Sequence, residues 1–461
     1  MKTLIRNGTI VTAVDTYRAD ILVDGEKIAA IGCDLTLPVD RVYDAADLYV
    51  LPGAIDVHTH FDMPFGGTVT ADDFRTGTLA AVFGGTTTIV DYAIQSKGQT
   101  LAAAVAAWQE KAEGKAVIDY GFHVAVTDPT DAVFEEIPEI VAAGVSSLKF
   151  FMAYKGTFQV DDGTLYRALV KARECGALVC VHAENGDIID ILVRQMLAAG
   201  QTAPLYHALS RPPELEGEAT GRVIALAEMA GAPVYIVHLT ARESLNRVRE
   251  ARDRGLPVFA ETCPQYLFLS IDNYNESGFN GAKYVMSPPL RTKETSEELW
   301  KGIMNGDLQV IGSDHCSFNM VQKELGRDDF SKIPNGAPGV ENRLTLMYHG
   351  GVGGGRISLN RLVDIVSTAP AKMFGLFPAK GTIAIGSDAD LVLFDPNREF
   401  TISASTHHQN VDYNCYEGFR GKGVPVRVFS RGDLLVENGQ FCGQDGRGRF
   451  IKRRSINFKE F

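Results

Sequence analysis

The feature that most constrains the fold is a repeated alternation of short apolar runs with longer, helix-like segments. The runs are rich in valine, isoleucine and aromatic residues, as buried strands are. Eight runs occur: Ala54–His58, Thr87–Tyr92, Val117–Val124, Ser147–Met152, Leu178–His182, Val234–His238, Val258–Glu261 and Leu308–Gly312. The segments with helical spacing are Asp73–Phe83, Leu101–Ala112, Asp131–Ala143, Asp162–Cys175, Glu214–Ala230, Ala241–Arg254, Ser296–Asn305 and Asn360–Phe374.

Eight strand–helix units in about 325 residues predict an α/β fold, a (β/α)8 TIM-like barrel with long loops. An open, doubly wound sheet is the alternative. That fold usually carries a GxGxxG turn after its first strand. The glycine cluster of this chain, residues 350–355, follows no predicted strand, so we expect it to be a loop. The pattern therefore favours the barrel.

The two ends of the chain have a different sequence pattern: short strands in which apolar and polar residues alternate, separated by glycines. The expected strands are Thr3–Arg6, Thr9–Ala13, Ala19–Val23, Lys27–Ile31, Gly381–Ile385, Asp390–Phe394, Val424–Ser430 and Leu434–Glu437. Neither end has enough strands for a stable sandwich of its own. We therefore expect residues 1–52 and 378–461 to form one small β-sandwich domain. The barrel of residues 53–377 would then be inserted between its two halves.

Composition and charge exclude several classes of protein. Of the 461 residues, 45% are hydrophobic and 22% are charged, which is typical of a globular chain and not of a disordered one. The net charge of −12 makes nucleic acid an unfavourable partner. The basic segment Arg447–Phe461 is a local exception. We expect it to pack on a neighbouring subunit or to be solvated.

The cysteines and the apolar runs bear on the location of the protein. The seven cysteines form no CxxC pair and are odd in number, which indicates a reduced, cytoplasmic chain. The first 17 residues contain no long apolar stretch, so no signal peptide is expected. No run of about 18 apolar residues occurs either, so we expect no membrane span.

Candidate metal ligands gather at the ends of the predicted strands. His58 and His60 are two residues apart in an extended chain, so both imidazoles can reach one metal ion. His182 ends the fifth strand, His238 ends the sixth, and Asp314 follows the eighth. Any one of these alone is more often structural. Together they lie where barrel active sites form, and they are the ligand types that Zn²⁺ and similar ions prefer.

A lysine lies in the fourth predicted strand. Lys149 is flanked by apolar residues, where an ammonium must find a partner or give up its charge. Two roles are open: a salt bridge at the barrel rim, or a carbamate formed with CO₂, an anion whose oxygens can bridge two metals. The remaining histidines considered have no place in the metal set and are expected to have structural or supporting roles: His123, His315, His407 and His408.

Together these motifs resemble the cyclic amidohydrolases of the amidohydrolase superfamily, most closely the D-hydantoinase/dihydropyrimidinase family. The resemblance extends over nearly the whole chain. It is carried by the segments LPGAIDVHTHFDMPFGGTV, SSLKFFMAYKG, VCVHAENGD, YIVHLT, ETCPQYL, SPPLR, IGSDHCSF, IPNG and KGTIAIGSDADLVLFDP. The most specific combination is HTHFDMPF with LKFFMAYKG and HAENGD.

The resemblance implies a barrel with a small β-sandwich and a site for two divalent metal ions. Zn²⁺ is the expected ion, and Mn²⁺ or Co²⁺ also suit such ligands. By this resemblance the more buried metal is bound by His58, His60 and Asp314, and the second by His182 and His238. The carboxylated Lys149 and a hydroxide then bridge the two ions, and the hydroxide attacks a ring amide carbonyl.

The same resemblance implies roles for residues that contact the substrate. Tyr154 would donate a hydrogen bond to the developing oxyanion, and Asp314 would carry a proton from the nucleophile to the leaving nitrogen. Groups near Ser287 and Asn335 would bind the –CO–NH–CO– edge of the ring. The pocket for the ring substituent is expected from four apolar residues at the rim: Met63, Phe65, Phe151 and Phe158.

The implied activity is hydrolysis of 5-substituted hydantoins, of dihydropyrimidines, or of both, to N-carbamoyl amino acids. Allantoinases and dihydroorotases share the metal architecture. They typically have Asn or Arg two residues after the second histidine, where this chain has Asp62, which would repel a carboxylate. A lactonase or urease-type hydrolase would not explain the MPFGGTV and MAYKG segments.

Other relatives of the family are non-enzymatic cytoskeletal scaffolds that have lost metal ligands. This chain keeps all six ligand positions, which argues against that role. The resemblance also implies a homotetramer, or at least a homodimer, acting on a small cyclic imide or ureide.

Overall fold

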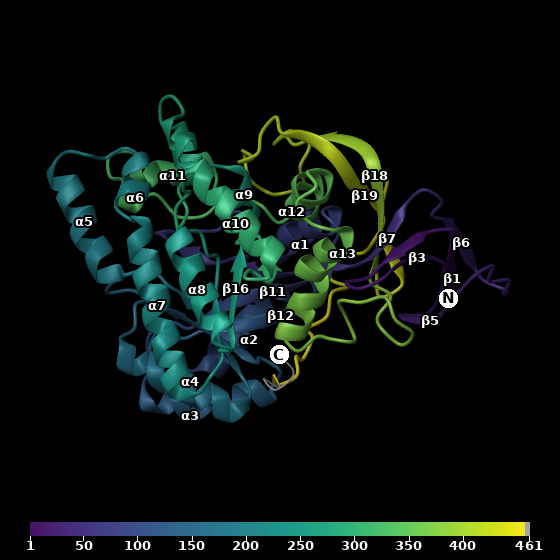
Figure 1. The fold of residues 1–461 in the computed structure, drawn as a ribbon, viewed down its shortest axis with the longest axis horizontal. Coiled ribbons are helices and arrows are strands. Elements are labelled where there is room, and N and C mark those ends of the chain that lie inside the picture. The colour runs from purple at the N-terminus through teal and green to yellow at the C-terminus, as the bar shows by residue number, and fades with distance from the viewer. Residues whose placement is uncertain (457–461) are drawn as a thin grey trace.

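The computed structural model describes residues 1–456 and is drawn in Figure 1. Eight parallel strands form its central sheet, and they are neighbours in the order in which they follow one another in the chain. They are β8 (Ala54–Thr59), β11 (Thr86–Ile94), β12 (Asp119–Ala125), β13 (Ser147–Phe151), β14 (Leu178–His182), β15 (Val234–Ile236), β16 (Val258–Thr262) and β17 (Val310–Ile311). The predicted TIM-like barrel is thereby confirmed.

The sheet closes between β17 and β8 through a narrow seam. β17 is only two residues long and pairs with β16. Across the seam, Thr59 forms an isolated bridge with His315, and the His60 N–H donates to the His315 carbonyl at 2.8 Å. The seam therefore brings the histidine pair after β8 next to the segment that follows β17.

Helices connect the strands and surround the barrel (Figure 1). The longer ones are α1 (Phe74–Phe83), α2 (Leu101–Ala112), α3 (Asp131–Ala142), α4 (Asp162–Cys175), α5 (Gly186–Ala198), α7 (Pro213–Ala230), α8 (Arg242–Asp253) and α10 (Lys293–Asn305). Their ends follow local rules. The Asp161 side chain accepts the Thr164 N–H at the start of α4, and Gly176 ends this helix with φ 70°. Helix α5 is an addition that the sequence pattern did not predict.

Shorter helices lie in the loops and near the end of the barrel. They are α6 (Leu205–Leu209), α9 (Pro264–Phe268), α11 (Met320–Lys323), α12 (Arg343–Met347), α13 (Leu359–Val363) and α14 (Ala369–Met373). A π-helical turn at Asp364–Thr368 joins α13 to α14, so the predicted helix at 360–374 is present. A second such turn, Tyr348–Gly353, includes the first glycines of the 350–355 cluster. The prediction of a loop there was wrong for these residues.

Strands from both chain ends form two sheets beside the barrel. One has the order β5-β4-β1-β6, and the other has the order β21-β20-β19-β18-β7-β2-β3. Their bounds are β1 (Lys2–Arg6), β2 (Thr9–Val11), β3 (Thr16–Arg18), β4 (Asp20–Asp24), β5 (Lys27–Gly32), β6 (Arg41–Asp44), β7 (Tyr49–Pro52), β18 (Leu391–Thr401), β19 (Arg420–Ser430), β20 (Asp433–Glu437) and β21 (Gln440–Phe441).

The two chain ends meet directly in the larger of these sheets. β7 pairs with β18 in antiparallel register, with Leu51 opposite Val392. Between the two sheets lies a core of buried aliphatic residues, which includes Ile21 and Leu393. The strand predicted at 381–385 is wrong, because these residues form no strand in the structure.

The basic C-terminal segment lies against the barrel of its own chain. The N–H groups of Gly448, Ile451 and Arg453 donate to carbonyls of Ala116, Tyr120 and Gly144, respectively, at 2.7 to 3.0 Å. Residues 447–456 are therefore not simply solvated, whereas contact of this segment with a neighbouring subunit stays a prediction, and 457–461 lie outside the described residues. Within residues 1–456, no helix is both long and apolar enough to cross a membrane.

Candidate active site

The predicted site residues converge at the carboxyl ends of the barrel strands. His58 and His60 lie at the end of β8 and just after it, Lys149 lies in β13, and His182 ends β14. His238 and Asp314 follow β15 and β17 within three residues. One cavity is lined by all thirteen predicted residues: His58, His60, Met63, Phe65, Lys149, Phe151, Tyr154, Phe158, His182, His238, Ser287, Asp314 and Asn335.

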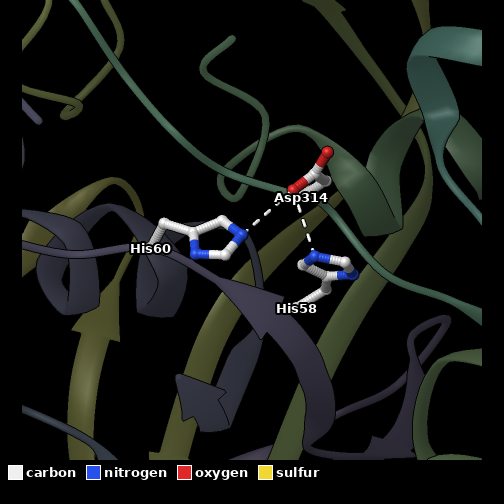
Figure 2. A group of neighbouring side chains, drawn as sticks. All are labelled: His58, His60 and Asp314. Atoms are coloured by element: carbon white, nitrogen blue, oxygen red, sulfur yellow. Dashed lines mark ion pairs between the residues drawn. The ribbon is translucent and has the colours of Figure 1, made fainter. Parts of the chain in front are cut away.

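One group of side chains could hold a metal ion as it stands. His58 Nε2 and His60 Nε2 lie 3.2 and 3.3 Å from the same oxygen of Asp314, as Figure 2 shows. One ligand atom from each of the three residues lies within 4.8 Å of the other two. Burial lowers the pKa of His58 well below its usual value. Burial alone would raise the pKa of Asp314, but the imidazoles of His58 and His60 hold it below its ordinary value. Neutral imidazoles and an ionised carboxylate are the forms that bind metals.

A second pair of imidazoles faces the same cavity. His182 Nδ1 lies 2.9 Å from His238 Nε2, and the other nitrogen of His182 lies 2.7 Å from a carboxylate oxygen of Glu184. The Nδ1 atom of His238 is buried without a hydrogen-bond partner among the described residues. A shared cation would bind these two nitrogens in their unprotonated form, which leaves the proton of His182 on Nε2, where it can donate to Glu184.

The lysine of β13 lines the cavity together with both groups. Lys149 Nζ is 4.9 Å from the ring centre of Tyr92 and 5.2 Å from that of Phe151. Burial lowers the pKa of Lys149 to about 8, although carboxylates such as Glu261 and Asp314 oppose the shift. The salt bridge at the rim that we considered for this lysine is replaced by a buried position over two aromatic rings.

A buried glutamate that was not predicted contacts two of the candidate ligand histidines. Glu261 contacts His58 Nδ1 through a short hydrogen bond and accepts the backbone N–H of His238 at 3.1 Å. The Tyr235 hydroxyl donates to its other oxygen at 2.9 Å. Burial raises the pKa of Glu261 to about 8. Glu261 ends the seventh predicted strand. This position could have marked it as a site residue, because most of the other candidate ligands also lie at strand ends.

A polar cluster also lines the cavity. The side-chain amide of Asn335 donates to the Ser287 hydroxyl at 3.2 Å, and both residues line the cavity together with Tyr154. Burial raises the pKa of Tyr154 to about 12. The tyrosine is therefore a hydrogen-bond donor at neutral pH.

Aromatic rings form the outer wall of the cavity. Phe158 packs against Phe65, Phe151 and Tyr154, with ring centres 5.3 to 6.1 Å apart. Three lining residues were not predicted: Ile94, Cys316 and Gly336. Each lies within two residues of a strand end or of a predicted site residue, which was the only sequence signal for them.

Of the six histidines outside the metal set, the four that were expected to have supporting roles have partners of other kinds. His123 lies 2.6 Å from the Ser147 hydroxyl and stacks on Tyr92, and His315 Nε2 lies 2.9 Å from Asp72. His408 contacts Glu341, and His407 lies 3.0 Å from the Val411 carbonyl. These contacts fit the expected supporting roles.

Asp62, whose charge was used to argue against substrates that carry a carboxylate, does not face the cavity. Asp62 is not among the residues that line the cavity, and its carbonyl accepts the Lys111 ammonium. The structure therefore gives no support to the argument that the Asp62 carboxylate would repel a substrate carboxylate.

Comparisons with known proteins agree with this geometry. A family model described as the amidohydrolase family matches residues 49–435. The D-hydantoinase of Geobacillus stearothermophilus is 57% identical over 455 residues, which cover 98% of this chain and 97% of that protein. The D-hydantoinase of Streptomyces coelicolor is 51% identical over 463 residues, which cover 99% of each chain.

Solved structures are equally similar. The crystal structure of dihydropyrimidinase from Brevibacillus agri has a TM-score of 0.98 and 57% sequence identity, and the match covers 99% of this chain and 100% of that one. An identity above one half over nearly the full length carries the activity class as well as the fold. The chain is a cyclic amidohydrolase and belongs to the D-hydantoinase/dihydropyrimidinase family of the amidohydrolase superfamily.

Proposed function

We propose that this protein opens the rings of 5-substituted hydantoins, of dihydropyrimidines, or of both, to give N-carbamoyl amino acids. The observation that carries the proposal is the convergence of six potential metal ligands and a polar cluster on one cavity. The D-hydantoinases and the dihydropyrimidinase that are 51–57% identical to this chain support the same substrate class.

The donor set suits two divalent cations, with Zn²⁺ as the expected ion and Mn²⁺ or Co²⁺ as alternatives. One would be held by His58, His60 and Asp314, whose ligand atoms already face one another. The other would be held by His182 and His238, whose ring nitrogens face each other at 2.9 Å. The carbamate of Lys149 would be the shared anionic ligand. Such a pair of cations, when bound, acidifies a water and polarises the substrate carbonyl.

Residues of the chain would then move the proton and hold the substrate. Asp314 is ionised and faces the cavity, so it can accept the proton of the nucleophile and deliver it to the leaving nitrogen. Tyr154 keeps its proton and can donate a hydrogen bond to the oxyanion.

The ring itself would lie between a polar and an apolar wall. Groups of Ser287 and Asn335 would pair with the –CO–NH–CO– edge, since both residues bring donors and acceptors to the cavity. The substituent on the ring would lie against the apolar wall of Met63, Phe65, Phe151 and Phe158.

A panel of ring substrates tests the proposal on protein loaded with zinc. It contains dihydrouracil, hydantoin, the D and L forms of 5-phenylhydantoin, dihydroorotate and allantoin. Fast opening of dihydrouracil or of the hydantoins supports the proposal and reports ring size and handedness together. Turnover of dihydroorotate or allantoin instead would show that the protein is one of the related amidohydrolases. No turnover of any ring by protein that holds two metals per chain would refute the proposed substrate class.

The remaining expectations belong to the same proposal. We propose that residues 1–52 plus 378–461 act as a supporting β-sandwich domain for the catalytic barrel of residues 53–377. The homotetrameric or homodimeric state and the cytoplasmic location stay predictions. A non-enzymatic scaffold remains the less favoured function, because six potential ligands line one cavity, and zinc analysis separates the two roles.

A further inference from the structure

A second buried lysine lies under the polar wall of the cavity. Lys323 ends helix α11, and its side chain has no exposed surface. Its ammonium donates to three backbone carbonyls, those of Val285 at 2.9 Å, Pro334 at 2.7 Å and Gly336 at 2.6 Å. The three N–H donors of an ammonium are thus matched by three acceptors.

These carbonyls come from the two segments that carry the polar wall. Val285 lies two residues before Ser287, and Pro334 and Gly336 are the neighbours of Asn335. The Gly336 N–H also donates to the Val285 carbonyl at 2.9 Å, so the two segments are in direct contact. One ammonium therefore fixes the spacing between the backbones of Ser287 and Asn335.

Lys323 does more than fill space in the core. Burial of a cation is costly, and a methionine of similar length would avoid that cost. The titratable groups that face the ammonium are the thiols of Cys316 and Cys415 and the imidazole of His207. Burial favours the neutral amine and lowers the pKa of Lys323 to about 7. The three carbonyls accept its N–H groups and are therefore the main partners that stabilise the charged form.

We propose that Lys323 is a positioning residue for substrate recognition: its ammonium clamps the two segments so that Ser287 and Asn335 are spaced to fit the –CO–NH–CO– edge. This inference rests on the proposed function, since it assigns the edge-binding role to these two residues. Lys323 itself lies outside the wall of the cavity and acts through them.

Kinetics of Lys323→Met in the full-length, metal-loaded protein test the clamp. Loss of the clamp misplaces the recognition groups and leaves the metal ligands in place. We expect KM to rise about 10- to 100-fold, with kcat within about threefold of the original and two metals per chain. The matched control is Lys293→Met, because this lysine is exposed and lies close in sequence to Ser287. A folded Lys323→Met protein with an unchanged KM would overturn the proposal.

Hydrogen exchange gives a readout that does not depend on catalysis. The Gly336 amide should exchange about tenfold faster or more in Lys323→Met, whereas the amides around His58 and His60 should not change. Equal exchange at Gly336 would overturn the clamp. If the unmodified protein opens none of the rings in the panel, the proposed function fails, and this exchange measurement still decides whether the clamp exists.

The unmodified protein provides a further test that remains available if Lys323→Met does not fold. Above pH 7 the lysine loses one of its three donors, while burial keeps both thiols and His207 neutral from pH 6 to 9. Exchange at Gly336, corrected for its intrinsic pH dependence, should therefore accelerate over this range. A corrected rate that stays constant while NMR shows that the Lys323 side chain loses its proton over this range would refute the clamp.

Discussion

Three residues of the site have positive φ angles, in the left-handed region of backbone conformation, where residues other than glycine are strained. The φ angles are 66° at Tyr154, 38° at His238 and 50° at Asp314. Such strain costs about 1–3 kcal/mol per residue and persists where the surrounding structure enforces it. All three residues line the cavity. The backbone is thus bent where side chains must turn inward from the ends of the strands.

Replacement of Lys149 by alanine should abolish tight binding of both metals. The side chain lines the same cavity as both groups of histidines, and its carbamate would be the only side-chain ligand common to both ions. Metal content after dialysis measures the effect directly. Lys155→Ala is the matched control, since this lysine is half exposed and pairs with Asp187. Two retained metals and full activity in Lys149→Ala would rule out the carbamate bridge.

Replacement of Tyr154 by phenylalanine should lower kcat and leave metal content unchanged. The substitution removes one hydroxyl that would stabilise the oxyanion, and loss of one such donor costs about 10²–10³-fold elsewhere. Steady-state kinetics and zinc analysis on the same preparation check both parts. Tyr166→Phe on helix α4 serves as the control because that ring is exposed. An unchanged kcat in Tyr154→Phe would remove this tyrosine from the reaction.

At the scale of the elements, periodic patterns predicted the barrel better than they predicted its loops. The eight strands were recognised because a buried parallel strand leaves a short apolar run, whatever contacts it makes. Helix α5 was missed because it is an extra helix between β14 and α7, and the pattern of eight units assigned one helix to each strand. The strand expected at 381–385 failed because alternating residues occur in loops too.

The candidate site was predictable to the extent that its ligands lie at strand ends. Five of the six potential ligands lie at or just after a strand end, and Lys149 lies inside its strand. The family resemblance extended the set to Tyr154, Ser287 and Asn335. Glu261 and Lys323 could not be assigned from the sequence, because their roles depend on what a buried charge contacts. Contacts between residues far apart in the chain leave no mark in a single sequence.

A close approach between two elements sets the position of the Tyr154 loop. At Gly186, the first residue of helix α5, an added Cβ would lie 2.7 Å from Ala153 Cα and 2.9 Å from the Met152 carbonyl. Gly186→Ala should therefore displace the loop, lower kcat and destabilise the fold by about 1–3 kcal/mol. Gly163→Ala on α4 is the control, because its Cβ would find only an ordinary contact at 3.5 Å. Equal kcat values for the two variants would contradict the argument.

At the scale of the molecule, the C-terminal segment ties the barrel together at the end opposite the site. Residues 448–456 cross the amino ends of β12, β13 and β14, where Tyr120, Gly144 and Gly176 accept or donate backbone hydrogen bonds. The metal site and the tail therefore occupy opposite ends of the same strands, and a change in one should leave the other intact.

Arg453 is the residue on which that separation can be tested. Its guanidinium is buried and donates to the Phe122 carbonyl and, at 2.8 Å, to the Ser147 hydroxyl. Arg453→Met keeps the apolar stem but leaves these acceptors unpaired, which should cost about 1–3 kcal/mol of stability. The melting temperature should fall, whereas metal content and kcat of the folded protein should not change. Arg454→Met, at the exposed neighbour, should have neither effect. If Arg453→Met instead lost metal or turnover at unchanged melting temperature, the barrel would transmit strain between its two ends, and the site could no longer be treated as independent of the tail.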